Sequence, residues 1–221
     1  MSAQLSRDAI IQRLLDPGVI AVVRARAARQ VPALAEALVA GGVIAVEVTM
    51  TTPDALEAIR ATAAALGPRG LVGVGTVLDA ATATAAIGAG AEFVVSPICR
   101  TELIGVAHRA GKPVMIGAYT PTEAQLAHEA GADFVKLFPA DGLGAGYVKA
   151  LRAPLPHLRL VPTGGVDLNT IPALIQAGCV AVGAGSSLVS ASILAAEDWP
   201  QLTRLAAQFV EAIRTARAAK S

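Results

Sequence analysis

The stretch FVKLFP at residues 134–139 is a short run of apolar and aromatic residues, typical of a buried β-strand. Runs of the same character occur at 19–25, 45–50, 71–77, 93–97, 113–118, 160–165 and 181–188. They start roughly every 20–26 residues, which is the length of one strand followed by one helix. This spacing predicts parallel strands that alternate with helices.

Alanine-rich amphipathic stretches lie between these runs, and several of them end at a glycine, such as Gly41, Gly111 or Gly131. Eight such units predict one (β/α)8 barrel, a TIM barrel, formed by residues 1–221 as a single domain. An open doubly wound sheet is the alternative, but no G-x-G-x-x-G motif opens a helix after the first strand.

Both ends of the chain are expected to add helices to this unit. Residues 6–16 predict an extra N-terminal helix that covers the bottom of the barrel. Residues 202–217 predict the closing amphipathic helix.

The bulk composition argues against several classes of partner. The formal net charge is +1, and no cluster of Lys and Arg marks a nucleic-acid or acidic-membrane surface. Residues 168–196 contain no charged residue, but Asn169, Pro172 and the Gly/Ser cluster at 183–187 argue against a membrane span. We expect a helix followed by a buried strand there.

The two cysteines and the start of the chain suggest a location. Cys99 and Cys179 match no metal-binding or redox spacing, which predicts reduced thiols in the cytoplasm. Arg7 and Asp8 interrupt the start of the chain, so we expect no signal peptide.

Lys136 is the unusual residue of the first stretch. A lysine is rarely buried without a partner, and burial favours its neutral amine, which is a nucleophile toward carbonyl groups. The alternative is a lysine at a strand edge whose amine reaches water.

Polar residues collect at the predicted C-terminal strand ends, where TIM barrels carry their active sites. Glu47 alternates with Val46 and Val48, so it faces the barrel interior if the valines pack on helices. This predicts an acid/base partner for Lys136, and a purely structural ion pair is the alternative. The other residues at strand ends are Arg24, Thr49, Thr51, Thr76, Ser96, Pro97, Phe138, Thr163, Gly164, Gly165, Gly185 and Ser186.

Glycine-rich turns end the last two predicted strands, at 163–165 and 183–186. Glycine lets backbone N–H groups approach an anion, and TIM barrels often bind phosphate at these two ends. Ordinary tight turns are the alternative. His108, His128 and His157 are expected on the surface, and no set of residues has metal-ligand spacing, so we expect chemistry without a metal or cofactor.

Seven motifs that occur in order along the chain resemble those of the class I 2-keto-3-deoxy-6-phosphogluconate (KDPG) aldolases. That group includes the 4-hydroxy-2-oxoglutarate and 6-phosphogalactonate aldolases. The motifs are Glu47-Val48-Thr49, which follows Gly-Gly-Val at 41–43, GVGTV at 73–77, Ser96-Pro97, TPTE at 120–123, KLFPA at 136–140, PTGGV at 162–166 and Gly185-Ser186.

The resemblance implies a role for each matching residue. Lys136 would form a Schiff base with pyruvate, and Glu47 would shuttle protons. The carboxylate pocket would contain Thr76, Phe138 and Thr163, with Pro97 nearby, and the phosphate site would contain Gly164, Gly165, Gly185 and Ser186. Arg24 matches a basic position that contacts substrate in some members. The reaction would convert the phosphorylated sugar acid to pyruvate and glyceraldehyde 3-phosphate in a homotrimer.

Three positions depart from the family pattern. Thr51 stands where many members carry Arg, Ile116-Gly117-Ala118-Tyr119 replaces a usual Pro-Gly, and Ser187 stands where some members have an aromatic residue. Two other readings remain open: another phosphate-binding barrel enzyme such as an epimerase, and a non-catalytic barrel that binds phospho-sugar acids. The gluconate and galactonate epimers are not distinguished.

Overall fold

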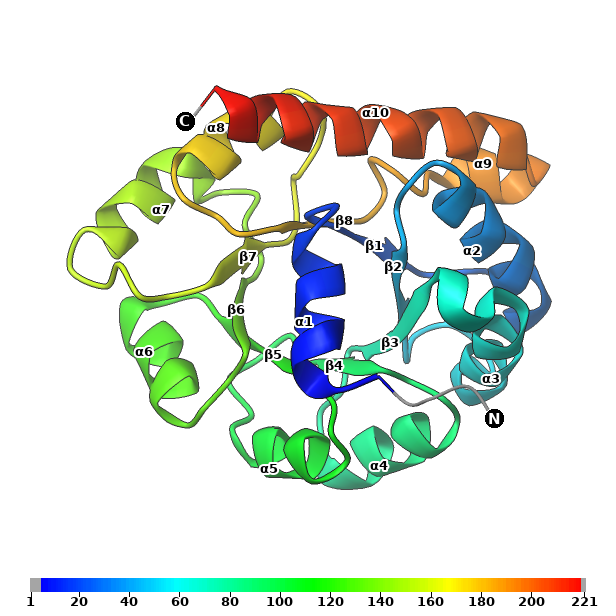
Figure 1. The fold of residues 1–221 in the computed structure, drawn as a ribbon, viewed down its shortest axis with the longest axis horizontal. Coiled ribbons are helices and arrows are strands. Elements are labelled where there is room, and N and C mark those ends of the chain that lie inside the picture. The colour runs from blue at the N-terminus through cyan, green and yellow to red at the C-terminus, as the bar shows by residue number, and fades with distance from the viewer. Residues whose placement is uncertain (1–4, 220–221) are drawn as a thin grey trace.

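The computed structural model, which describes residues 5–219, is a ring of eight parallel strands enclosed by helices (Figure 1). Neighbouring strands pair in chain order from β1 to β7, and β8 pairs with β1. An isolated bridge between Thr163 and Gly183 joins β7 to β8, so the barrel is nearly closed. The strands are β1 (Val19–Val23), β2 (Ala45–Thr49), β3 (Leu71–Gly75), β4 (Phe93–Val95), β5 (Val114–Ala118), β6 (Phe134–Leu137), β7 (Leu160–Pro162) and β8 (Val182–Ala184).

This architecture confirms the predicted (β/α)8 TIM barrel. Every strand is shorter than the apolar run that predicted it. In all but β5, the last residues of the run leave the ladder and form the following loop. Those residues include most of the candidate site.

One helix follows each of the first seven strands, and two follow the last. The long α10 begins before the predicted 202–217, because Asp198 caps it by accepting a hydrogen bond from the Gln201 backbone N–H. The short α9 was not predicted. The helices after β1 are α2 (Val31–Ala40), α3 (Ala55–Leu66), α4 (Ala80–Gly88), α5 (Glu102–Arg109), α6 (Pro121–Glu129), α7 (Gly144–Arg152), α8 (Ile171–Gln176), α9 (Ala191–Ala196) and α10 (Trp199–Ala218), with the 3-10 turns η1 (Ala28–Gln30) and η2 (Gly67–Arg69).

The N-terminal helix α1 (Arg7–Leu15) lies across the N-terminal opening of the barrel, as Figure 1 shows. Ser6 caps it by accepting a hydrogen bond from the Ala9 backbone N–H. Its Ile10 and Leu14 pack against inward side chains such as Phe93. The predicted extra helix is confirmed, and this end of the barrel is filled with apolar side chains.

Alternation along β2 divides its side chains between two environments. Val46 and Val48 pack outward with the helices, while Ala45 belongs to the inner apolar cluster. Glu47 has the same parity as Ala45 and is buried. The lower barrel is therefore apolar and the upper barrel carries the polar groups, which places the candidate site at the C-terminal mouth.

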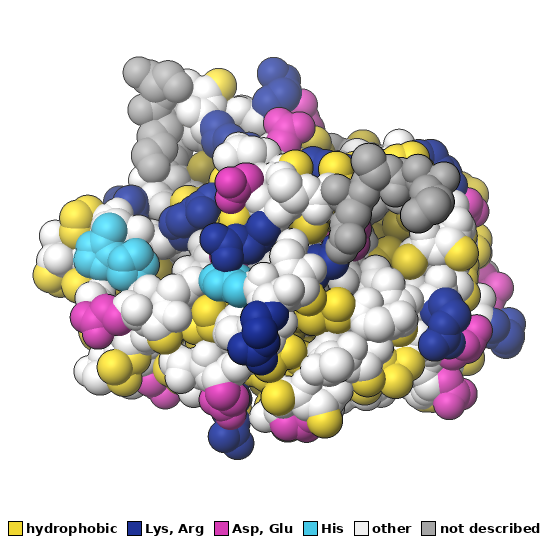
Figure 2. Space-filling view, turned by 60° about the horizontal axis from the view of Figure 1, so that its bottom comes forward, with side chains coloured by type: hydrophobic (Ala, Val, Ile, Leu, Met, Phe, Trp, Pro, Cys, Tyr) yellow, Lys and Arg dark blue, Asp and Glu magenta, His cyan; other side chains and the backbone are white. Residues whose placement is uncertain are grey.

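The distribution of surface charge and the hydropathy of the helices can be compared with what nucleic-acid and membrane partners require. Figure 2 shows basic and acidic side chains interspersed over the face in view, with apolar patches between them. Among the helices described, none combines the length and hydropathy needed to cross a membrane. The uncharged stretch at 168–196 forms α8, β8 and α9.

Candidate active site

Lys136 and Glu47 form an ion pair inside the barrel. Lys136 comes from β6 and Glu47 from β2, four strands apart in the ring of eight, so the two side chains meet from opposite walls. Lys136 Nζ lies 3.3 Å from Glu47 Oε1. The side chains are 5% and 3% exposed, so water hardly reaches either group. The strand-edge alternative for Lys136 is therefore wrong.

Two inward-facing glycines leave room at the mouth, one for the Glu47 carboxylate and one for the backbone of Pro97. A Cβ atom on Gly75 in β3 would overlap the Glu47 carboxylate. A Cβ atom on Gly117, which lies beside Lys136 in the β5–β6 register, would overlap the backbone of Pro97. Any side chain at either position would displace the groups that meet here.

The Lys136–Glu47 pair is buried and has an aromatic neighbour. Burying two charges costs solvation energy, which their attraction offsets only in part. The Phe138 ring adds a cation–π contact, with its centroid 5.3 Å from Lys136 Nζ. A group that can attack a carbonyl carbon therefore lies beside a group that can transfer protons during a reaction.

The last residue of β2 is hydrogen-bonded to the neighbouring strand β1 and to the loop that follows β2. The Thr49 hydroxyl donates to the Val23 carbonyl over 3.1 Å, and the Thr49 and Thr51 hydroxyl oxygens are 2.8 Å apart. Thr51 is exposed at the mouth and offers an uncharged hydroxyl, where an arginine would offer a charged guanidinium.

Thr76 and Pro97 follow β3 and β4 at the same mouth. Thr76 has φ 60°, in the left-handed region that costs energy for a β-branched residue. Such strained residues concentrate at functional sites. Pro97 is held against β5, since its backbone lies where a Gly117 side chain would project.

A second space opens at the ends of β6, β7, β8 and β1. This cavity of about 380 Å³, here called the distal cavity, brings together seven of the predicted site residues. Lys136, Glu47, Thr51, Thr76 and Pro97 do not line it. The predicted residues in its wall are Arg24, Phe138, Thr163, Gly164, Gly165, Gly185 and Ser186.

The turn after β7 exposes its backbone to the distal cavity. Gly164 and Gly165 have φ of 99° and 64°, a conformation that side chains rarely adopt. The Ser187 hydroxyl donates to the Val166 carbonyl, which joins this turn to the loop after β8. The two glycine-rich turns therefore form one wall.

Sequence reasoning missed two acidic residues in the distal cavity, Asp141 and Asp167. Each immediately follows a quoted motif, KLFPA at 136–140 and PTGGV at 162–166, and that position was the available signal. Because backbone N–H groups of Thr170 and Asn169 bond the Asp167 carboxylate, its pKa lies below the usual value.

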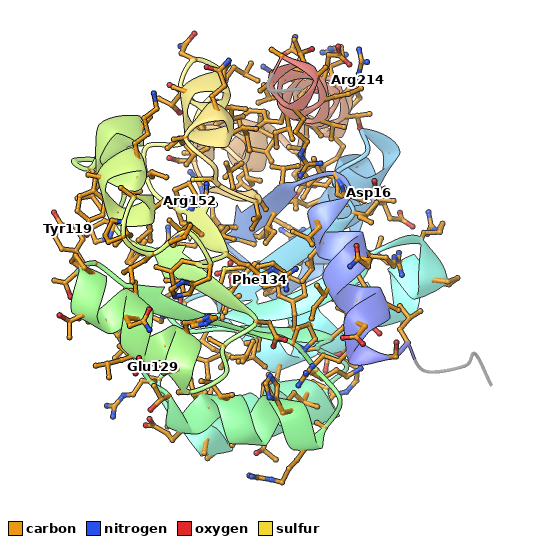
Figure 3. All side chains as sticks on the ribbon, turned by 60° about the vertical axis from the view of Figure 1, so that its left-hand side comes forward. Asp16, Tyr119, Glu129, Phe134, Arg152 and Arg214 are labelled. Carbon is orange, nitrogen blue, oxygen red and sulfur yellow. The ribbon has the colours of Figure 1, made fainter. Side chains whose placement is uncertain are left out.

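Tyr119 forms part of the rim of the mouth. Figure 3 shows it on the side of the molecule away from α1, whereas Phe134 lies inside the barrel. The Tyr147 hydroxyl of α7 donates to the Tyr119 carbonyl over 2.7 Å. Burial raises the pKa of Tyr147, so its phenol stays protonated and keeps donating this bond at neutral pH.

The histidines lie apart from the Lys136–Glu47 pair. His157 bonds Gln125, and His128 lies 4.6 Å from His157 between ring centroids. His108 is less exposed than predicted, because its ring lies 2.9 Å from the Asp133 carboxylate, whose side chain is 7% exposed. Within residues 5–219, no three His, Cys, Asp or Glu side chains are grouped as a metal site would need.

These features define a class of protein: a (β/α)8 barrel with a buried amine and carboxylate at its C-terminal mouth, an arrangement suited to carbonyl chemistry. The sequence model of the family "KDPG and KHG aldolase" matches residues 10–205. The chain belongs to this family of aldolases.

Relatives within the family differ in the substrate they are named for. The 2-dehydro-3-deoxy-phosphogluconate aldolase of Pseudomonas aeruginosa is 37% identical, over 80% of this chain and 81% of its own. The 2-dehydro-3-deoxy-6-phosphogalactonate aldolase of Escherichia coli is 35% identical, over 89% and 95%.

A solved structure bears on the chemistry. It is the KDPG aldolase of Legionella pneumophila with pyruvate captured as a covalent carbinolamine intermediate. It is 29% identical, with a TM-score of 0.82 over 89% of this chain and 96% of its own.

Proposed function

We propose that this protein is a Schiff-base aldolase that reversibly cleaves a 2-keto-3-deoxy-6-phospho sugar acid to pyruvate and glyceraldehyde 3-phosphate. The observation that carries the proposal is the buried Lys136–Glu47 pair, 3.3 Å apart at the mouth of the barrel. The carbinolamine in the Legionella relative supports a covalent route through an amine.

The first half of the reaction makes an electron sink. The Lys136 amine attacks the C2 ketone, and loss of water from the carbinolamine gives an iminium ion. Glu47 takes the proton of the C4 hydroxyl, directly or through a water. The C3–C4 electron pair then moves to the iminium nitrogen, the aldehyde leaves, and an enamine remains.

The second half restores the protein. Glu47 returns a proton to C3 of the enamine, and water hydrolyses the new iminium to release pyruvate and the free amine. Phe138, within cation–π distance of Lys136 Nζ, packs on the pyruvyl group and excludes water. Thr76, Pro97 and Thr163 surround the substrate carboxylate in this proposal, and Thr51 offers it a hydroxyl.

One experiment distinguishes the proposed aldolase from the two alternatives, another phosphate-binding barrel enzyme and a non-catalytic binding protein. Incubation with pyruvate and borohydride, followed by mass spectrometry of peptides, should show reduced pyruvyl on Lys136. A barrel that only binds phospho-sugar acids would give no adduct, and neither would an epimerase. Absence of an adduct would therefore remove the proposed mechanism.

In the proposed function the distal cavity holds the 6-phosphate through backbone N–H groups of the two glycine-rich turns and the Ser186 hydroxyl. We expect Gly185→Val to lower kcat/KM for the phosphorylated substrate by about ten- to a hundredfold more than for 4-hydroxy-2-oxoglutarate, which has no phosphate. A Cβ atom on Gly185 meets no atom within 4 Å, so the new side chain projects into open space at the cavity wall without colliding with backbone.

Gly88→Val is the matched control, since Gly88 also has free space around it but ends α4, away from the distal cavity. Its kcat/KM should match that of the unaltered protein on both substrates. Equal losses on the two substrates for Gly185→Val would show that the phosphate binds elsewhere.

We also propose a homotrimer, in which copies of the chain cover an apolar rim. Leu78, Ile98 and Tyr119 follow the adjacent strands β3, β4 and β5 and are 46%, 46% and 47% exposed. Light scattering should give three times the chain mass of 22.3 kDa. Ile98→Asp should shift the protein toward the monomer, and a monomeric unaltered protein would contradict the proposal.

A further inference from the structure

The distal cavity has an unexpected charge balance for a phosphate site. Among the described residues that line it, Arg24 is the one cation, and the same wall contains two carboxylates, Asp141 and Asp167. The Thr51 hydroxyl adds no positive charge at the mouth. The side-chain charges therefore do not favour an incoming dianion.

Asp167 contributes a fixed negative charge that is already engaged. Its Oδ1 accepts from the backbone N–H groups of Asn169 over 2.9 Å and Thr170 over 2.8 Å. These bonds stabilise the loop between β7 and α8 and keep the carboxylate ionised. Asp167 therefore stabilises the loop, and its negative charge is present in the distal cavity whichever substrate binds.

Asp141 lies directly against the turn that would hold the phosphate. A Cβ atom on Gly164 would overlap the Asp141 carboxylate, and one on Gly165 would lie 3.0 Å from Asp141 Cα. The Ala140 backbone N–H donates to the Thr163 carbonyl over 2.9 Å and holds the two loops together. Asp141 is therefore placed by the backbone of both loops.

The Asp141 carboxylate is available to a ligand. It is exposed, and within residues 5–219 none of the hydrogen bonds or ion pairs identified includes it. A carboxylate repels a phosphate dianion placed on the adjacent turn, since like charges a few ångströms apart interact unfavourably even in water. The same carboxylate accepts a hydrogen bond from a hydroxyl group.

We propose that Asp141 determines specificity at the distal end of the substrate: it weakens binding of a phosphate ester and lets the protein use 2-keto-3-deoxy sugar acids that end in a hydroxyl group. This inference rests on the proposed aldolase function. It adds an unphosphorylated substrate class to that function and assigns its recognition to one side chain.

The test compares one variant on two substrates that differ only in the phosphate. Asp141→Asn should raise kcat/KM for 2-keto-3-deoxy-6-phosphogluconate by about tenfold, mainly through a lower KM, because a repulsive charge is removed. The same variant should lower kcat/KM for 2-keto-3-deoxygluconate by about threefold, because the hydroxyl loses a charged acceptor. Changes of opposite sign are not expected from a general loss of structure.

Two further variants separate this effect from others. Asp141→Glu retains the charge and should keep the substrate preference of the unaltered protein. Glu129→Gln removes an exposed carboxylate of α6 that does not line the distal cavity, and it should change neither substrate. An unchanged preference in Asp141→Asn, or equal changes on both substrates, would overturn the proposal.

A binding measurement keeps the inference testable if the aldolase proposal fails. Calorimetric titration with inorganic phosphate should show binding about tenfold tighter to Asp141→Asn than to the unaltered protein. Equal or weaker phosphate binding would overturn the role of Asp141. Failure to trap pyruvate on Lys136 would instead remove the aldolase proposal and leave this comparison intact.

Discussion

Lys136→Met should abolish aldol cleavage, with kcat lowered by about 10⁴-fold or more, because the covalent route needs an amine and methionine has none. The variant should also give no reduced pyruvyl adduct with borohydride. Methionine retains much of the length and the apolar stem of lysine, so the packing of β6 should be kept. Both readouts come from the same preparation, which is first checked for folding by circular dichroism.

The barrel offers a matched control for this substitution. Lys112 is also buried, with its side chain 7% exposed, and its Nζ lies 3.9 Å from Glu92 Oε1. It precedes β5, at the other end of the strand from the mouth. Lys112→Met should therefore retain turnover and the adduct on Lys136, whatever its effect on stability.

Removing Lys136 also leaves the Glu47 carboxylate buried without its cation, which costs about 3–5 kcal/mol when a buried pair is broken on one side. Thermal unfolding should detect this loss. Lys136→Arg restores a positive charge while offering no nucleophilic amine. Substantial aldolase activity in a folded Lys136→Met or Lys136→Arg protein would show that another residue forms the Schiff base.

Glu47→Gln should lower kcat by about 10²–10⁴-fold, the usual effect of losing a general base, while pyruvate is still trapped on Lys136. Glutamine has nearly the same shape, but it cannot accept the C4 hydroxyl proton at neutral pH. The variant should therefore separate formation of the covalent intermediate from cleavage of the C3–C4 bond.

Glu92→Gln serves as the control, because Glu92 pairs with the other buried lysine. It should leave kcat unchanged. An unchanged kcat in Glu47→Gln would assign Glu47 a structural role as the counter-ion of Lys136. Loss of the pyruvate adduct in Glu47→Gln would instead place Glu47 in the first step of the reaction.

Local geometry explains why much of the fold, and the pairing of Lys136 with Glu47, could be predicted. Side chains alternate along a strand, so the valines at 46 and 48 already assign Glu47 to the opposite face of β2. Each of the eight apolar runs contains a strand that the structure forms. The N-terminal helix follows from its Ser6 cap and its apolar stripe.

Predictions were weaker where the outcome depends on contacts between distant parts of the chain. The partial burial of His108 accompanies its contact with Asp133, which comes from the segment before β6. The pairing of Thr163 with Gly183, which joins β7 to β8 and nearly closes the ring, links residues twenty positions apart. Neither contact has a signature in the local pattern.

The sequence by itself determined the repeating order of strands and helices, the direction of the Lys136 and Glu47 side chains into the barrel, and the family. Each of these follows from the periodicity of neighbouring residues or from the order of motifs along the chain. Only the tertiary structure brought Lys136 and Glu47 to 3.3 Å across the barrel. It also placed Asp141 on the Gly164–Gly165 turn. The first result depends on two strands that face each other across the ring, and the second on the pairing of the adjacent strands β6 and β7. Both set distances between residues far apart in the chain, which the local sequence pattern does not specify.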